Sequence, residues 1–128
     1  MFEALNMSGS GMGVHQAWMD AISDNIANVS TVRRTSEAAY QSRYVVAASK
    51  ESGGVEVAGI ALSSPVGKLT YDPANPLADA QGLVRLPDVD LGEQLTTSIM
   101  AQRGYEANIS QLERVKSAYQ AAIQMGRS

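Results

Sequence analysis

The sequence contains no cysteine and only one histidine, His15, which excludes several kinds of chemistry at the outset. Thiol catalysis, disulfide bonds and thiolate metal sites all require cysteine. His15 lies in an expected helix and has no second histidine or carboxylate three or four residues away, so we interpret it as a structural residue. The chain offers no nucleophile with a nearby base. We therefore expect a protein that is not an enzyme, with no catalytic residues, no cofactor and no metal ion.

Two short patterns that superficially suggest ligand binding lack the required spacing. The glycines between positions 9 and 13 do not form G-x-G-x-x-G and follow no predicted strand, so they do not indicate a phosphate-binding loop. The aspartates at positions 72, 79, 88 and 90 lack the spacing of a calcium-binding loop. Neither pattern changes the expectation that cofactors and metals are absent.

Large hydrophobic side chains are also scarce. Leu, Ile, Val and Phe together make up 27 of the 128 residues, whereas alanine alone accounts for 18. This content is just above the level at which chains stay disordered. The net charge of -3 is too small to indicate a general nucleic-acid binder. The composition favours alanine-rich helices that complete their burial against partner subunits over a compact enzyme.

No run of apolar residues is long enough to suggest a membrane span. A transmembrane helix needs about 18 or more predominantly apolar residues, and no such stretch occurs. The first residues, Met1 to Asn6, lack the basic and apolar regions of a secretory signal. We expect neither a membrane span nor a cleaved signal peptide.

A first amphipathic helix is predicted from about residue 5 to residue 29. Hydrophobic residues recur there every seven positions, and a neighbouring stripe includes Ile22. The recurring positions are Leu5, Met12, Met19 and Ile26. Three glycines near the beginning weaken the first turns by roughly 1 kcal/mol each relative to alanine. The start of this helix should therefore be loose when it is alone.

A second and clearer helix is predicted from about residue 90 to residue 125. Asp90 followed by Glu93 resembles a capping box, and Gly126 is expected to end the helix. Spacings of four and three define a heptad seam: Leu91, Leu95, Ser98, Gln102, Tyr105, Ile109, Leu112, Lys116, Tyr119 and Ile123. Such a helix is ~54 Å long, because each residue adds about 1.5 Å. That length is too great for a chain of 13.6 kDa to cover by itself.

The segment between the helices holds all four prolines and strand-like runs. Residues 55–62 alternate like a strand and are expected to pair with residues 66–71 through a turn at Ser63–Pro65. Residues 71–76 are expected to form an extended loop, since residues before proline avoid the helical region. Residues 82–87 resemble a short strand. Residues 31–53 are expected to be largely irregular.

The basic pair Arg33–Arg34 allows two interpretations. A pair of arginines in a loop is usually solvated. In an assembly, the same pair could contact acidic loops of a neighbouring subunit, such as those around Asp72 and Asp79. The sequence favours neither interpretation.

Taken together, these patterns predict a mainly α fold. The two long terminal amphipathic helices, about 5–29 and 90–125, are expected to pack as a coiled-coil-like pair. Residues 1–30 and 88–128 would form one helical core. Residues 31–87 would form an extended loop and a small β-hairpin region.

Two blocks of the sequence carry recognisable motifs. The first contains Ser10-Gly11-Met12, Gln16, Met19-Asp20 and the run Asn25-Ile26-Ala27-Asn28-Val29, followed by Thr31. The second runs from Tyr71 to Val84 and from Pro87 to Asp90, and continues with Glu93, Arg103, Tyr105, Ala107-Asn108 and Lys116. These blocks resemble the axial proteins of the bacterial flagellum, the family of rod, hook and hook-junction subunits. The second block and the short length resemble the proximal rod type C of that family.

This resemblance implies a structural protein without catalysis. Members of the family form a helical tube, with the C-terminal helix inside and the N-terminal helix packed around it, and the rod transmits torque to the hook. The implied partners are further copies of the chain, other rod proteins and the flagellar type III export apparatus, with the inner-membrane ring complex nearby. No nucleic acid and no small-molecule substrate is implied. The implied location is the periplasmic rod of the basal body, reached without a cleaved signal peptide.

The helical seams supply the candidate residues for subunit contacts. These candidates are Leu5, Met12, Met19, Ile22, Ile26, Asn28, Leu91, Leu95, Gln102, Tyr105, Ile109, Leu112, Lys116, Tyr119 and Ile123. The alternative is a soluble helical-hairpin module that binds a partner helix, in which the same seams would form an ordinary core. A helix of ~36 residues paired with one of ~25 residues argues against a closed core, because the longer helix outruns its partner.

Overall fold

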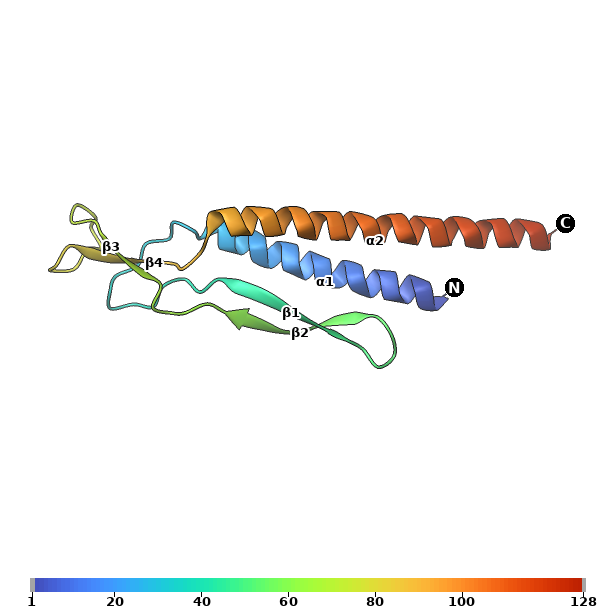
Figure 1. Cartoon of the computed structure of the whole chain (residues 1–128), viewed down its shortest axis with the longest axis horizontal. Coiled ribbons are helices and arrows are strands. Elements are labelled where there is room, and N and C mark those ends of the chain that lie inside the picture. Colours follow the sequence, from blue (N-terminus) through green and yellow to red (C-terminus); the bar gives the residue numbers. More distant parts are fainter. Residues whose placement is uncertain (1, 128) are drawn as a thin grey trace.

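The computed structural model describes residues 2–127 and shows an elongated molecule built on two long helices that lie side by side (Figure 1). Helix α1 spans Phe2–Ala27 and helix α2 spans Leu91–Gly126. The helices run in opposite directions, so the start of α1 lies near the end of α2 (Figure 1). Two small antiparallel hairpins complete the fold. The architecture is therefore mixed α and β, with the two expected terminal helices, and the expected mainly α class is not confirmed.

The predicted helices are confirmed, with bounds shifted by a few residues. Asp90 caps α2, since its side chain accepts a hydrogen bond from the backbone N–H of Glu93 at 3.0 Å. The helix was expected to reach residue 125 with Gly126 as the glycine that stops it, but it ends one residue later and Gly126 has no positive φ angle. Gly126 is the last helical residue, and Arg127 caps the helix in a right-handed conformation, with its N–H donating to the carbonyl of Gln124. A right-handed cap needs no glycine.

Small and polar residues make up most of the buried positions of α1 and α2. The buried positions are Ser8, Gly11, Ala21, Ile22 and Asn25 on α1, and Gln94 and Ala101 on α2. A side chain at Gly104 would collide with the ring of His15, and one at Gly11 would lie 2.9 Å from Oδ1 of Asn108. The helices thus approach closely through glycine and alanine. These contacts do not confirm the expected coiled-coil packing, in which large apolar residues interlock.

Strand pairing differs from the prediction in the middle segment. Strand β2 (Val55–Leu62) pairs with β1 (Arg43–Ser49), and β3 (Lys68–Tyr71) pairs with β4 (Leu83–Leu86). The expected hairpin between residues 55–62 and 66–71 is wrong, and residues 43–49 are a strand rather than irregular. The turn lies at Gly53 and Gly54, whose φ angles of 92° and 88° favour glycine.

The region between Tyr71 and Leu83 folds into successive turns. The N–H of Asp72 donates to the carbonyl of Gly82, which closes the loop, and the N–H of Asn75 donates to the carbonyl of Asp72. The expected extended loop over residues 71–76 is therefore wrong beyond its first residue. The strand-like run near residues 82–87 is confirmed as β4, and Arg85 of β4 also exchanges two backbone hydrogen bonds with Arg33.

The hydrophobic core is small and lies at one end of the helix pair and beside it. The buried hydrophobic residues among those described are Ala21, Ile22, Ala39, Val84, Val89 and Ala101. The first turns of α1, by contrast, are largely exposed or half-buried. The fold therefore has a better packed end, where α1 ends and α2 begins, and a thinner end at Phe2.

We expect the isolated monomer to be only partly folded. Amides in the first three turns of α1 should exchange rapidly with solvent, because glycines weaken these turns and little apolar surface covers them. Amides near Asn25 should exchange more slowly. Hydrogen–deuterium exchange on dilute full-length protein, together with circular dichroism, measures both. A cooperative melt with strong protection across residues 5–29 would contradict this expectation.

Candidate functional site

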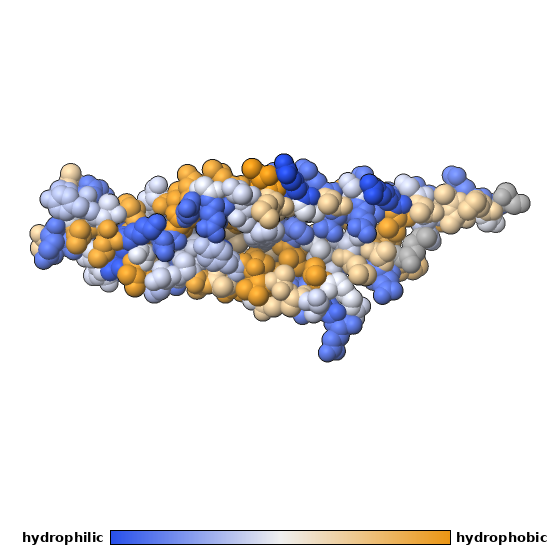
Figure 2. Space-filling model, in the orientation of Figure 1, coloured by the Kyte–Doolittle hydropathy of each residue, from blue (hydrophilic) through white to orange (hydrophobic). Residues whose placement is uncertain are grey.

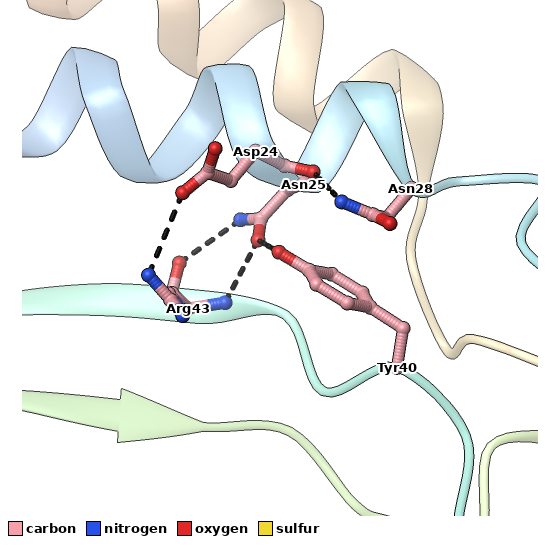
Figure 3. A network of polar contacts seen from close by, with 5 residues as sticks. All are labelled: Asp24, Asn25, Asn28, Tyr40 and Arg43. Atoms are coloured by element: carbon pink, nitrogen blue, oxygen red, sulfur yellow. Dashed lines mark hydrogen bonds and ion pairs between the residues drawn. The ribbon is translucent and has the colours of Figure 1, made fainter.

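Asn25 is the centre of a polar network that joins α1 to the first hairpin (Figure 3) and, through Gln94, to α2. Its side chain is fully buried. Its Nδ2 donates to the carbonyl of Arg43 at 2.9 Å and to Oε1 of Gln94 at 3.0 Å. Its Oδ1 accepts from the N–H of Arg43 at 2.8 Å and from the hydroxyl of Tyr40 at 3.1 Å. All four hydrogen bonds that an asparagine amide commonly makes are therefore formed.

The surroundings of Tyr40 favour the protonated form of its phenol. Partial burial raises the pKa of the Tyr40 phenol, and the carboxylate of Asp24 adds to this effect, while the guanidinium of Arg43 opposes it. The phenol therefore remains a hydrogen-bond donor to Asn25. Asp24 and Arg43 also form an ion pair at 3.5 Å, but both side chains are more than half exposed, so the pair adds little stability.

Asn28 stabilises the C-terminal end of α1, three residues after Asn25. Its Nδ2 donates to the carbonyl of Asp24 at 2.9 Å, and its Oδ1 accepts from the hydroxyl of Thr31 at 3.1 Å. These bonds satisfy backbone and side-chain groups where α1 ends at Ala27. The two asparagines of the Asn25-Ile26-Ala27-Asn28 run thus have different tasks. Asn25 joins separate elements, whereas Asn28 stabilises the local end of the helix.

The candidate subunit-contact residues fall into two groups in the structure. One group is buried or half-buried within the chain: Leu5, Met12, Met19, Ile22, Ile26, Asn28, Tyr105, Ile109 and Leu112. The other group is exposed: Leu91, Leu95, Gln102, Lys116, Tyr119 and Ile123. The predicted α2 seam is therefore rotated partly away from α1. The seam residues at 98, 105 and 112 are half-buried, whereas those at 95, 102, 116 and 123 are exposed.

Two apolar surfaces remain open on the helix pair. Over the first half of α2, hydrophobic residues gather along the edge of the molecule away from α1 (Figure 2). At the opposite end, a groove of about 350 Å³ lies between the beginning of α1 and the end of α2. It is lined by Phe2, Leu5, Leu112, Glu113, Lys116 and Tyr119. Open apolar surfaces on a short chain are typical of a subunit that buries them against neighbours.

Several residues of the site were missed by the sequence analysis. Tyr40, Arg43 and Gln94 complete the Asn25 network, and Gly104 permits the close approach of the helices. A usable signal was present only in α2, where Gln94, Ala101 and Asn108 recur every seven residues. A seven-residue repeat of small and polar residues is weaker than one of large apolar residues, although here it marks the face that meets α1.

The single histidine is used within α1, and the described residues gather no metal-binding cluster. Nδ1 of His15 donates to the carbonyl of Gly11 at 2.8 Å, and its ring lies 6.0 Å from that of Trp18. Residues 2–127 contain no group of three or more metal-ligating side chains. Neither helix in this range combines the length and hydropathy needed to cross a membrane. The chemistry of the site is packing and hydrogen bonding.

Asp79 organises the loop that connects β3 and β4. Its Oδ1 accepts from the N–H groups of Gln81 and Leu83, both at 2.9 Å, and its Oδ2 accepts from the hydroxyl of Thr35 at 3.0 Å. Hydrogen bonds from Leu83, and then from Thr35 and Gln81, lower the pKa of this carboxyl, while some desolvation opposes them. The carboxylate is thus used within its own chain. A contact between Asp79 and arginines of a neighbour stays a prediction.

Acid should loosen this loop. Because the native pKa of Asp79 is lowered, its contribution to stability is present above the unfolded value near 4 and is lost as pH falls through the native value. The amide proton shifts of Gln81 and Leu83, followed by NMR below about pH 4, should therefore titrate together. Replacement of Asp79 with Asn should remove that titration. An unchanged titration in the variant would show that another group is responsible.

Comparison with known proteins places these features in a family. Residues 80–125 match the family model described as the C-terminal region of flagellar basal body rod FlgEFG proteins. The chain is 32% identical to the flagellar basal-body rod protein FlgC of Salmonella typhimurium over 132 residues, covering 99% of this chain and 98% of that protein. The chain belongs to the FlgC family of flagellar basal-body rod proteins. The resemblance found in the sequence motifs is thereby confirmed.

Other members of the FlgC family are similar over nearly their whole length. The rod protein FlgC of Borreliella burgdorferi is 32% identical, with 96% of this chain and 95% of that protein covered. FlgC of Bacillus subtilis is 29% identical, with 98% of each covered. The similarity to FlgC thus includes the middle segment with its hairpins and both helices. The family is one of structural rod subunits, which agrees with an open, elongated molecule.

Proposed function

We propose that this protein is a structural subunit of the flagellar basal-body rod, in which it assembles helically with further copies and with other rod proteins. The rod would act as the drive shaft that transmits torque to the hook. The observation that supports assembly into a rod is the presence of two open apolar surfaces, one on α2 and one beside Phe2. Their burial against neighbours would supply the hydrophobic stabilisation that the small core lacks.

The two groups of candidate residues suggest a division of roles. The exposed group, exemplified by Leu91, Leu95 and Ile123, would contact neighbouring subunits. The buried group, exemplified by Ile22 and Tyr105, would hold α1 against α2 and so shape the surface that neighbours meet. Gln102 and Lys116 are polar positions within the seam, and polar residues at such positions fix register at some cost in stability.

We also propose a route of export and a location for the protein. The chain would pass unfolded through the flagellar type III export apparatus, without a cleaved signal peptide, and assemble in the periplasm close to the inner-membrane ring complex. A small core and a helix weakened by glycines support this route, because little free energy opposes unfolding before export. No enzymatic activity is proposed, since the family is one of structural rod subunits.

The decisive experiment is the isolation of basal bodies from cells in which the chain carries a small epitope tag. We expect the tag in the rod fraction and expect deletion of the gene to leave cells without completed rods. A tagged protein found only as a discrete monomer or dimer in solution, with normal rods in the deletion strain, would favour the soluble helical-hairpin module instead. Sedimentation of the purified protein measures that state directly.

The helices and the middle segment are proposed to form separate functional parts. Residues 1–30 and 88–128 would build the tube, and residues 31–87 would secure contacts with neighbours. The first hairpin lies along α1. It is bonded to α1 at Arg43, through Asn25, and again near its tip, where the N–H of Val55 donates to Oγ of Ser10 at 3.1 Å. The rest of β2 is almost entirely exposed.

Shortening the hairpin tip between Ser49 and Gly54 should leave export intact and weaken the assembled rod. The tip lies outside both helices, so the seams of α1 and α2 should remain. Secretion of the subunit and the resistance of purified rods to acid or detergent are the measurements. Substitution of the exposed Glu51 by alanine is the control and should be neutral. Blocked secretion with unchanged rod stability would contradict the proposed division.

A further inference from the structure

Two polar side chains between α1 and α2 each lie over a glycine of the opposite helix. A Cβ atom added at Gly104 of α2 would lie 2.6 Å from Cδ2 of His15 of α1. A Cβ atom added at Gly11 of α1 would lie 2.9 Å from Oδ1 of Asn108 of α2. Each glycine therefore leaves a space that the opposite side chain fills. We refer to the His15–Gly104 and Gly11–Asn108 pairs as the register contacts.

The same two polar side chains are held by hydrogen bonds within their own helices. Nδ1 of His15 donates to the carbonyl of Gly11 at 2.8 Å. Nδ2 of Asn108 donates to the carbonyl of Gly104 at 2.9 Å. Each side chain thus bonds to the glycine four residues before it and covers the glycine of the other helix. The two pairs have the same geometry with the roles of the helices exchanged.

The other glycines of α1 have different surroundings. Cβ atoms added at Gly9 and Gly13 would meet no atom within 4 Å among residues 2–127. Glycine in a helix interior is destabilising relative to alanine. Gly11 permits a close contact that offsets this cost, whereas the described structure shows no such contact at Gly9 or Gly13.

The face of α2 that meets α1 would otherwise allow more than one alignment of the helices. Gln94, Ala101 and Asn108 recur there every seven residues, and the first two are buried. The large side chains of Leu95 and Ile99 are about half exposed. A shift by one heptad would therefore present a similar set of small and polar residues to α1. In coiled coils, a single polar residue in the contact face can specify the register.

The register contacts and the Asn25 network share one alignment. The two register contacts are four residues apart on each helix. The hydrogen bond between Asn25 and Gln94 lies ten residues further along α1 than His15 and ten residues before Gly104 on α2. Because the helices are antiparallel, all three contacts correspond to the same register along the pair.

A shift of seven residues would remove the space that His15 occupies. Depending on the direction of the shift, its ring would face Gln111 or Thr97 in place of Gly104. Neither residue leaves the space that a glycine leaves. The second register contact would be lost by the same shift.

We infer that the two register contacts, rather than the large apolar residues of the predicted seam, set the alignment of α1 along α2. This alignment brings Asn25 to Gln94 and lets α2 continue past Phe2 as far as Gly126 (Figure 1). Both contacts lie within one chain, so they act whether or not the chain assembles into a rod. The inference is therefore independent of the proposed function.

Pulsed electron paramagnetic resonance on the purified full chain measures this alignment. Gln16→Cys and Ser117→Cys place nitroxide labels at two exposed positions, and the native chain has no cysteine that would also be labelled. In the observed register these positions are ~21 Å apart along the helix axis, and a shift by seven residues changes that separation by ~10 Å. The labelled chain without further substitutions should give one narrow distance.

Exchange of the two residues of one register contact tests whether they act as a pair. Gly104→His alone would place two imidazoles in one space and should abolish the narrow distance. His15→Gly alone would leave that space empty and should broaden the distance. The two substitutions together should restore the native distance, because the imidazole at position 104 can bond to the carbonyl of Met100 and lie over the glycine at position 15. The double variant keeps the composition of the native chain, so helix propensities largely cancel.

Gly9→His is the matched control, because a side chain at this position enters open space. This variant should keep the narrow native distance. Retention of the native distance in Gly104→His, or its absence in the exchanged pair, would overturn the inference. A broad distribution in the labelled chain without further substitutions would overturn it as well, since the register would then not be set within the chain.

Discussion

Replacement of Leu112 with aspartate is expected to abolish rod completion and swimming. Leu112 is half-buried and forms a wall of the groove beside Phe2, together with Leu5 and Phe2. A carboxylate at this position would sit in an apolar wall that assembly removes from water. Taking a charge out of water costs several kcal/mol, and the nearby Lys116 would have to lose its own water to pair with it. Each copy in a repeating array would bear this cost. Electron microscopy of basal bodies and a swimming assay measure the outcome.

The matched control for this substitution is the adjacent residue. Gln111 is exposed, and Gln111→Ala should change stability by no more than roughly 0.5 kcal/mol and leave motility intact. Secretion should continue in both variants, since the export signal of the family is expected at the N-terminal end. Equal motility of the two variants would show that this side of α2 contacts no neighbour, and would favour the helical-hairpin module.

Replacement of Asn25 with alanine is expected to have the largest effect on the stability of the single chain. The substitution leaves four buried or half-buried groups without their partner, on Arg43, Tyr40 and Gln94. Each unsatisfied buried group costs about 1–3 kcal/mol, so a loss of about 3 kcal/mol or more is expected. Urea unfolding of the purified full chain, followed by circular dichroism, measures this loss.

Asn28 provides the comparison for Asn25. Its side chain bonds only within the last turn of α1 and the residues that follow, so Asn28→Ala should cost only about 1 kcal/mol. A larger loss for Asn28 than for Asn25 would contradict the view that the Asn25 network joins the separate elements. Rod assembly should follow the same order, because the network positions the hairpin beside both helices.

Both helices could be predicted from the sequence because their signals are local. The seven-residue recurrence of apolar residues and the Asp90 cap depend only on neighbours along the chain. The strand pairing depends on which segments meet, and the sequence suggested the wrong pair. The serines and proline at 63–65 resembled a turn, but the chain reverses at Gly53–Gly54, whose positive φ angles suit a tight hairpin.

The face through which the helices meet was not predictable from hydrophobicity. That criterion selects Leu91, Leu95 and Ile109 as the seam, whereas the closest approach occurs at Gly11 and Gly104. Close packing of two backbones requires small residues, which contribute little to a hydrophobic pattern. The sequence thus proposed a set of contact residues on the two helices, and the structure separates those facing inward from those facing outward. Their contacts with neighbouring subunits stay a prediction.

The attachment of the two helices is unequal along their length, and this has a mechanical consequence. At one end, the amide of Asn25 bonds α1 to Gln94 of α2 and to β1. At the other end, the described contact is an aromatic one between Phe2 and Tyr119, without a hydrogen bond between their side chains. A pulling force on the Phe2 end of α1 would therefore separate α1 from α2 progressively, beginning at Phe2, and the Asn25 network would resist the last step. A subunit strained in a turning shaft would yield at Phe2 first and recover without losing its anchored end.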